Sequence, residues 1–363
     1  MKQRNRGLLT IIGIAEFNIN VRVKGVMLFI AINEAILKMK TSVKMIIFLG
    51  YFLGCQQKAI IIEDTKNFIA FERAPEAGSI VDFDVWLINI RTKEEIRLTQ
   101  NLEYWEYGSV WLSDSELLYL IEPQEKTGTE TDIIYINLKT GKRRLLDYWT
   151  WENCPRTGGI SVDSLRNIYY ANFEEIIYVL VHKENKYQLT TFFSDRGSTR
   201  FRPEDLGLKE IFNPVVSSDG SKLLFCACDT AKYRRLGELK KFHYDIYLYD
   251  CKEKSLKRLT EGDSTYEDPI WIGNDTIVFC SNCDGNYELY LMALKDKNMI
   301  RLTSTEDISE MEPTVSPDHQ QIAYMRYQGE YRFKDVEIWI MDLKTKETWF
   351  LTKGGSPAWS PAR

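Results

Sequence analysis

The residues with the clearest chemical potential are carboxylates interleaved with aromatic rings in four short stretches of the 363-residue chain. These stretches are 103–109 (EYWEYGS), 148–159 (YWTWENCPRTGG), 265–269 (TYEDP) and 309–313 (SEMEP). Aromatic rings beside carboxylates can stack on sugars, bind a cationic peptide or hold a divalent ion. The candidate binding residues are Tyr104, Trp105, Glu106, Tyr107, Trp151, Glu152, Arg156, Tyr266, Glu267, Asp268, Glu310 and Glu312. In the alternative interpretation the rings pack inside the protein and the acids are only hydrated.

Signatures of catalysis are sparse. The three histidines, His182, His243 and His319, are scattered, which disfavours a catalytic metal centre built on histidine. The sequence has neither a Gly-x-Ser-x-Gly nucleophile motif nor a glycine-rich phosphate loop. We therefore expect no cofactor and favour a non-enzymatic function, with a divalent cation among the acidic stretches as an open alternative.

Four of the seven cysteines lie at equivalent places in neighbouring repeats. Cys226 and Cys228 stand in LLFCACD, and Cys280 and Cys283 stand in IVFCSNCDG. Four such thiols could bind zinc or form disulfides. We expect small buried thiols rather than a metal site, because equivalent positions of adjacent repeats are too far apart for one tetrahedral ion. Free, bridged and metal-bound states all stay open at this point.

The elements that must position these residues recur along the chain. A Leu-Thr-like pair after a basic or polar stretch returns at intervals of 43 to 70 residues, at Leu98, Leu145, Leu189, Leu259, Leu302 and Leu351. Each interval contains a short apolar strand, a turn rich in Asp, Gly and Ser, and a strand that ends on an aromatic. A third strand then begins with an acid, as in DIYLYD at 245–250, and a fourth carries the marker. This periodicity predicts a β-propeller.

Counting the repeats gives the number of blades. Complete repeats begin near Ser109, Gly158, Pro214, Pro269 and Pro313. The segment 67–99 lacks a first strand, and SPAWSP at 356–361 is a first strand without the other three. The sequence therefore predicts an all-β, six-bladed propeller with four antiparallel strands per blade. The C-terminal strand would close the first blade by pairing beside residues 68–71, which removes two open edges.

This pattern resembles the TolB-like, WD40-like repeats of bacterial six-bladed propellers. Residues 269–303 and 313–343 match best, the resemblance covers about 66–363, and the third blade, around Glu175, matches least. The resemblance implies a binding scaffold, a peptidase lid or a lyase. The missing nucleophile motif disfavours the peptidase lid.

One face of such a propeller carries the longer loops. Connections between second and third strands are long at 72–83, 122–131, 229–244 and 326–336, and long loops on a rigid scaffold usually hold binding sites. The loops entering the first strands, which contain the candidate residues, would line the mouth of the central channel on this face. We therefore expect a monomeric scaffold that binds an envelope protein or a peptide. The alternative is an enzyme of the oligogalacturonate-lyase type, for which His243 and Arg156 are the candidate groups. A net charge of -5 gives no support for nucleic-acid binding.

The N-terminal region resembles a targeting signal. Residues 39–55 (MKTSVKMIIFLGYFLGC) combine Lys40 and Lys44 with an apolar run that is too short to span a bilayer. The run ends at Cys55 and resembles the lipobox of bacterial lipoproteins, although Leu53 stands where a small residue is usual. We expect a signal segment within 1–54, with translation starting at Met39, and a propeller over 55–363. A lipid on Cys55 would anchor the exported protein in the periplasm or on the outer surface. The alternative is a longer membrane-associated N-terminus in which Cys55 is an ordinary buried thiol.

Overall fold

The computed structural model describes residues 60–74, 83–100, 104–123, 131–146, 155–172, 177–184, 186–191, 206–229 and 243–361. The chain divides into two compact units, residues 1–56 and 57–363, and every described residue belongs to the second. The expected signal segment, Met39 and the expected lipid site at Cys55 lie outside the described residues. Within the described ranges, no helix has the length and apolar character needed to cross a membrane.

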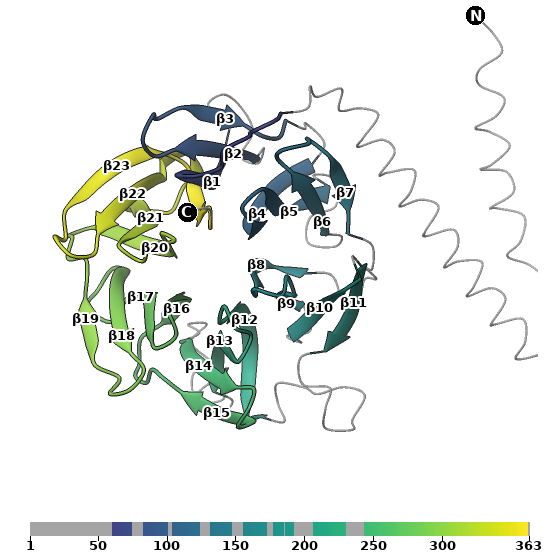
Figure 1. Ribbon diagram of the computed structural model, residues 1–363. Helices are drawn as coiled ribbons and strands as arrows, with labels where there is room; N and C mark the ends of the chain where they lie inside the picture. The colour runs from purple at the N-terminus through teal and green to yellow at the C-terminus, as the bar shows by residue number, and fades with distance from the viewer. Residues whose placement is uncertain are drawn as a thin grey trace, which may run out of the picture. The chain divides into compact units, whose positions relative to one another are not determined.

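The second unit is a ring of six antiparallel sheets with four strands each, as the repeat count predicted (Figure 1). Blade 1 contains β24 (Gly355–Trp359), β1 (Phe68–Arg73), β2 (Asp84–Asn89) and β3 (Glu95–Arg97). Blade 2 contains β4 (Tyr104–Ser113), β5 (Glu116–Pro123), β6 (Asp132–Asn137) and β7 (Arg143–Leu145). Blade 3 contains β8 (Pro155–Val162), β9 (Ile168–Asn172), β10 (Ile177–Lys183) and β11 (Lys186–Thr191).

The other three blades repeat the same strand order. Blade 4 contains β12 (Leu208–Val216), β13 (Lys222–Asp229), β14 (Asp245–Asp250) and β15 (Ser255–Arg258). Blade 5 contains β16 (Tyr266–Ile272), β17 (Thr276–Ser281), β18 (Glu288–Ala293) and β19 (Met299–Arg301). Blade 6 contains β20 (Ile308–Val315), β21 (Gln321–Gln328), β22 (Glu337–Asp342) and β23 (Thr348–Lys353). The first strand of each blade lies innermost and the fourth lies at the periphery (Figure 1).

The C-terminal strand closes the ring, as predicted. β24 pairs antiparallel with β1, with Trp359 opposite Ile69 and Ala358 opposite Ala70. The Trp359 side chain is 8% exposed and belongs to a core cluster that joins blades 1 and 6. The Trp111 indole N–H of blade 2 donates to the Ala358 carbonyl at 2.9 Å, which ties the closing strand to the next blade as well.

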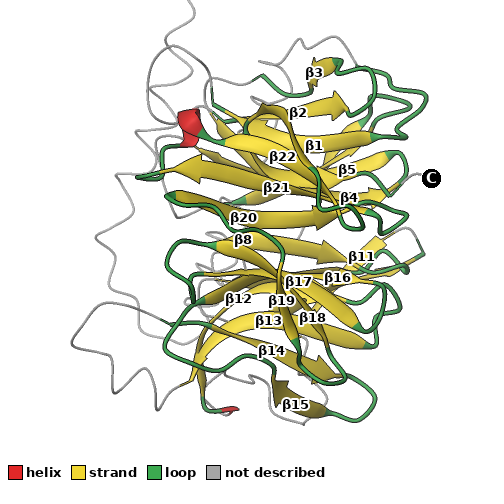
Figure 2. Ribbon diagram, turned by 90° about the vertical axis from the view of Figure 1, so that its left-hand side faces the viewer, coloured by secondary structure: helices red, strands yellow, loops and turns green. Residues whose placement is uncertain are grey.

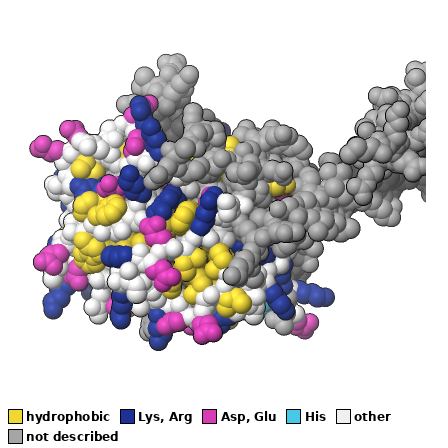
Figure 3. Space-filling view, turned by 90° about the horizontal axis from the view of Figure 1, so that it is seen from above, with side chains coloured by type: hydrophobic (Ala, Val, Ile, Leu, Met, Phe, Trp, Pro, Cys, Tyr) yellow, Lys and Arg dark blue, Asp and Glu magenta, His cyan; other side chains and the backbone are white. Residues whose placement is uncertain are grey.

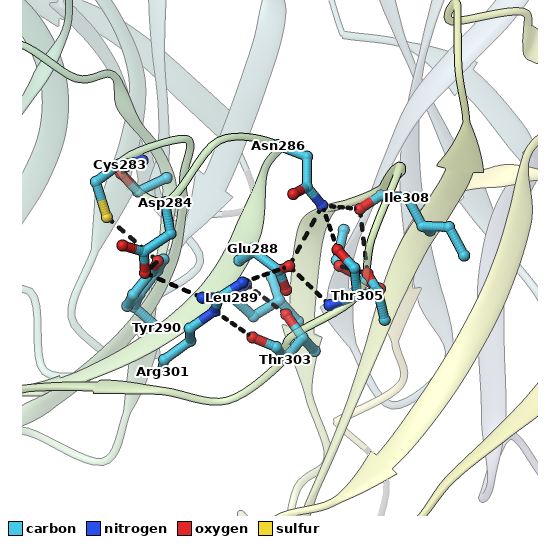
Figure 4. A network of polar contacts seen from close by, with 12 residues as sticks. Cys283, Asp284, Asn286, Glu288, Leu289, Tyr290, Arg301, Thr303, Thr305 and Ile308 are labelled. Atoms are coloured by element: carbon cyan, nitrogen blue, oxygen red, sulfur yellow. Dashed lines mark hydrogen bonds and ion pairs between the residues drawn. The ribbon is translucent and has the colours of Figure 1, made fainter.

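The recurring Arg-Leu-Thr marker has a physical cause. In three blades its arginine pairs with the acid that begins the third strand, at 2.5, 2.6 and 2.8 Å in Asp84–Arg97, Asp245–Arg258 and Glu288–Arg301. In the same blades the marker threonine accepts the N–H of the next third-strand residue at 2.8–2.9 Å, through the hydroxyls of Thr99, Thr260 and Thr303. Figure 4 shows this arrangement around Glu288, Arg301 and Thr303. The ion pair and the hydrogen bond of the marker thus hold the short fourth strand against the third strand of the same blade.

The two faces of the ring differ in their connections. Second and third strands are joined by long connections in blades 1, 2, 4 and 6, and the face that carries them is called the long-loop face below. The described connection from β21 to β22 contains the helix η3 (Phe333–Asp335), seen at the left of the edge-on view (Figure 2). The opposite face carries the tight turns between first and second and between third and fourth strands, and is called the short-turn face. At the edge of the ring, which Figure 3 shows, charged side chains of both signs are interspersed with hydrophobic ones.

Candidate functional site

The predicted binding residues lie in the innermost strands rather than in loops, which corrects that part of the prediction. Tyr104 to Tyr107 belong to β4, Tyr266 to Asp268 belong to β16, and Glu310 and Glu312 belong to β20. Arg156 belongs to β8, whereas Trp151 and Glu152 lie outside the described residues. The reason is that each innermost strand contains a β-bulge and begins before it, so residues that were expected in the preceding loop belong to the strand.

Each of the six innermost strands contains a β-bulge at the same place. At each bulge one residue adopts a positive φ, between 48° and 120°, and these residues are Gly108, Gly159, Asn213, Asp268, Glu312 and Ser356. We call these six residues the axial bulge ring. The left-handed conformation suits glycine, is tolerated by asparagine and aspartate, and costs energy at Glu312 and Ser356. Four of the six precede a proline, which is a sequence signal for this position.

Side chains of the axial bulge ring connect neighbouring blades. The Asn213 amide donates to Asp268 Oδ1 at 2.7 Å, and the Glu312 N–H lies 3.4 Å from Asp268 Oδ2. Hydrogen bonds from Ser356 in turn reach the Glu312 carboxylate. A Cβ added at Gly159 would lie 2.9 Å from Asn213 Oδ1, so that glycine is required for the close approach of Asn213. Contacts therefore run from blade 3 through blades 4, 5 and 6 to blade 1.

Glu72 is a further carboxylate beside the axial bulge ring that the sequence interpretation missed. The carboxyls of Glu72, Glu267, Asp268 and Glu312 are together called the axial site below. It lies opposite Gly355 in blade 1, is 4% exposed, and its Oε1 accepts the N–H of Gly108 from blade 2. The equivalent second-strand residues of the other blades that pair at this position are apolar or thiols, namely Leu120, Cys226, Cys280 and Met325. Glu72 thus places a carboxylate at a position that holds an apolar or thiol side chain in the other blades. This equivalence can be recognised only from the strand register.

Burial raises the pKa values of the carboxyl groups at the axis. Burial raises the pKa of Glu72 to about 8, and the Glu312 carboxylate adds to this shift. Burial and the neighbouring Asp268 raise the pKa of Glu312 to about 7 and that of Glu267 to about 8. Burial raises the pKa of Asp268 too. These groups therefore gain or lose charge readily when a charged ligand approaches.

One aromatic side chain of the long-loop face lies near enough to the same carboxyls for their charge to affect it. Tyr331, in the β21–β22 connection, is 47% exposed and meets Tyr327 edge-to-face with ring centroids 5.1 Å apart. Burial of its phenol, and then the proximity of Glu312 and Glu72, raise the pKa of Tyr331. Tyr331 thus adds an accessible ring to the carboxyls of the axial site.

Most of the remaining predicted residues are buried in their blades or paired with another side chain. Tyr104, Glu106 and Tyr266 are buried within their blades, Trp105 is half-buried, and the Tyr107 hydroxyl donates to Glu122 at 3.1 Å. Glu310 is 1% exposed and lies 3.5 Å from Arg326, away from the axial contacts described above. Of the predicted set, the structure brings together Glu267, Asp268 and Glu312.

None of the described cysteines forms a disulfide. Cys226 and Cys280 are buried, and the Cys280 thiol lies 3.5 Å from Asp268 Oδ2. Cys228, Cys251 and Cys283 are likewise not disulfide-bonded. Within the described ranges, no three His, Cys, Asp or Glu side chains are arranged to hold a metal ion.

Comparison with known proteins supports the architecture. No protein-family model matches the chain. The chain is 34% identical over 88 residues to the Protein TolB homolog of Chlorobaculum tepidum, a match that covers 23% of this chain and only 19% of that protein. Crystal structures with the same fold include TolB from Acinetobacter baumannii, with a TM-score of 0.59 and 17% identity over 83% of this chain and 68% of that one.

Two further solved structures have the same fold. The putative TolB from Agrobacterium tumefaciens has a TM-score of 0.55 and 17% identity, covering 78% of this chain and 95% of that one. The tricorn protease has a TM-score of 0.53 and 14% identity, covering 79% of this chain and 26% of that one. The protein is therefore a six-bladed β-propeller with carboxyl groups gathered at its axis. Its fold is of the TolB type, and its sequence is similar to that of a TolB homologue over 88 residues.

Proposed function

We propose that this protein is a non-enzymatic scaffold of the cell envelope that binds a protein or peptide through its long-loop face. The observation that carries the proposal is the convergence of Glu72, Asp268 and Glu312, from three blades, with the accessible ring of Tyr331. Its similarity to TolB proteins supports an exported, protein-binding role. A lipid on Cys55 would hold the protein at the membrane.

The chemistry of the axial site fits a positively charged partner segment. A lysine, an arginine or an amino terminus would lower the pKa of the surrounding carboxyls and leave them ionised. Burial strengthens such an ion pair relative to one in bulk water. The Tyr331 ring adds a cation–π surface beside the carboxyls. Binding would therefore release protons, and the affinity would rise with pH between about 6 and 8 because Glu312 and Glu72 titrate there.

The test is affinity recovery of partners from an envelope extract. The wild-type chain is compared with Asp268→Asn/Glu312→Gln and with the matched control Asp296→Asn/Glu347→Gln, whose acids are exposed on the short-turn face. We expect the axial variant to lose a partner that the wild type and the control both retain. Equal recovery by all three proteins would contradict the proposal that the partner binds at the axial site. An unsaturated product from uronate oligosaccharides, followed by ultraviolet absorbance, would support the lyase alternative instead.

A further inference from the structure

Basic side chains recur at the periphery of the short-turn face. Each turn between third and fourth strands carries two Lys or Arg residues, within 90–94, 138–142, 183–186, 251–254, 294–298 and 343–347. All twelve are exposed, and the same ranges contain five acids. This peripheral excess of positive charge stands out in a chain whose formal net charge is -5. We call the twelve residues the basic rim.

Four of these lysines occupy a backbone position that suits glycine. Lys93, Lys254, Lys297 and Lys346 have φ between 50° and 65°. In blade 2 the same turn position is filled by Gly141, with φ 66°. A lysine is strained in this left-handed region, where glycine is not. In blade 3 the corresponding turn has Glu184 with φ 49°, so four of the six turns place a positive charge in this left-handed region.

The described chain begins on the short-turn face. The N–H of Ile62 donates to the Leu138 carbonyl at 2.9 Å, and Leu138 directly precedes Lys139 of the basic rim. Thr65 donates its hydroxyl to the Asp114 carbonyl in another turn of this face. Ile60 follows Cys55 by five positions, and five extended residue steps reach at most about 18 Å. A lipid on Cys55 would therefore hold the short-turn face close to the bilayer.

We infer that the basic rim docks the short-turn face on an anionic phospholipid surface and turns the long-loop face away from the membrane. This inference rests on the proposed function for the lipid on Cys55. A lipid on Cys55 would bring the protein to the membrane, and basic residues near an anionic surface add an attraction of about 1 kcal/mol each that favours one orientation. Exposed charges act over about one Debye length, so the rim contributes only when the face lies against the headgroups.

The test measures how the full-length protein partitions onto vesicles. Vesicles of phosphatidylcholine alone are compared with vesicles that also contain phosphatidylglycerol. The anchor contributes equally to both, so the ratio of the two partition coefficients reports the rim. We expect the wild type to prefer the anionic vesicles, by about fivefold for each lysine that reaches the surface, and this preference to fall as salt is added.

Two rim variants and one control decide the outcome. Lys295→Glu/Lys344→Glu changes lysines outside the left-handed positions, and Lys139→Glu/Lys142→Glu tests another part of the rim. The control Arg332→Glu/Lys334→Glu reverses two exposed charges of the long-loop connection. We expect both rim variants to lower the ratio at least about tenfold and the control to leave it unchanged. An unchanged ratio in the rim variants, or an equal fall in the control, would overturn the inference. Partner recovery from extract reports the proposed function separately, since the rim variants keep the axial site.

Discussion

The buried carboxyl of Glu72 makes stability depend on pH in a defined direction. Its pKa is about 8 in the folded protein and 4.5 in the unfolded chain. Below 4.5 both states hold the proton, and the group has no effect. As the pH rises from about 4.5 to 8, the unfolded chain releases the proton first and the free energy of unfolding falls. Each pH unit in this window costs about 1.4 kcal/mol, which gives up to about 3 kcal/mol at pH 7.

Glu72→Gln removes this titration while keeping an oxygen that can accept the Gly108 N–H. We expect the variant to lie within about 1 kcal/mol of the wild type at pH 5 and to exceed it by about 4 kcal/mol at pH 8. The measurement is denaturant unfolding at both pH values, with the exposed Glu94→Gln as the control. A difference between variant and wild type that is the same at pH 5 and pH 8 would refute the assignment of a buried, proton-holding carboxyl.

Three further variants test the fold around the site. Trp359→Ala should lower the free energy of unfolding by about 3–5 kcal/mol, because it empties the core between the closing strand and blade 6; a change below about 1 kcal/mol would contradict ring closure. Gly159→Ala should lower the melting temperature, since its Cβ would lie 2.9 Å from Asn213 Oδ1, and an unchanged melting curve would show that this approach is not required. Thr260→Val leaves the buried N–H of Ile246 without its 2.9 Å partner and should cost about 1–3 kcal/mol in denaturant unfolding; a neutral result would dispute the role given to the marker threonine.

The architecture was predictable because the interactions that hold each blade together join residues that are close in sequence. The Arg-Leu-Thr marker and the acid that begins the third strand lie only about a dozen residues apart, as in Asp245 and Arg258, so their pairing appears as a short repeated pattern. The closure by β24 was predictable for the same reason. Trp359 follows Ser-Pro-Ala as a first strand should, and only residues 67–99 lacked one.

The composition of the axial site could not be predicted to the same degree. Successive strand residues point to opposite faces, so a shift of one residue decides whether an acid faces the axis or the blade interior. Glu267 stands directly before a bulge residue, whereas Glu106 stands two places before Gly108 and is buried. Glu72 joins the site only through the pairing of β1 with β24, strands from opposite ends of the described chain.

Cross-linking of the intact protein to its partners in envelope extract, read by mass spectrometry, tests the central claim most directly. Lys334 lies in η3 on the long-loop face, whereas Lys139, Lys295 and Lys344 lie on the short-turn face. A scaffold that binds through its long-loop face predicts partner cross-links at Lys334 that disappear in Asp268→Asn/Glu312→Gln. Partner cross-links concentrated on Lys139, Lys295 and Lys344, and unaffected by the axial substitutions, would contradict it.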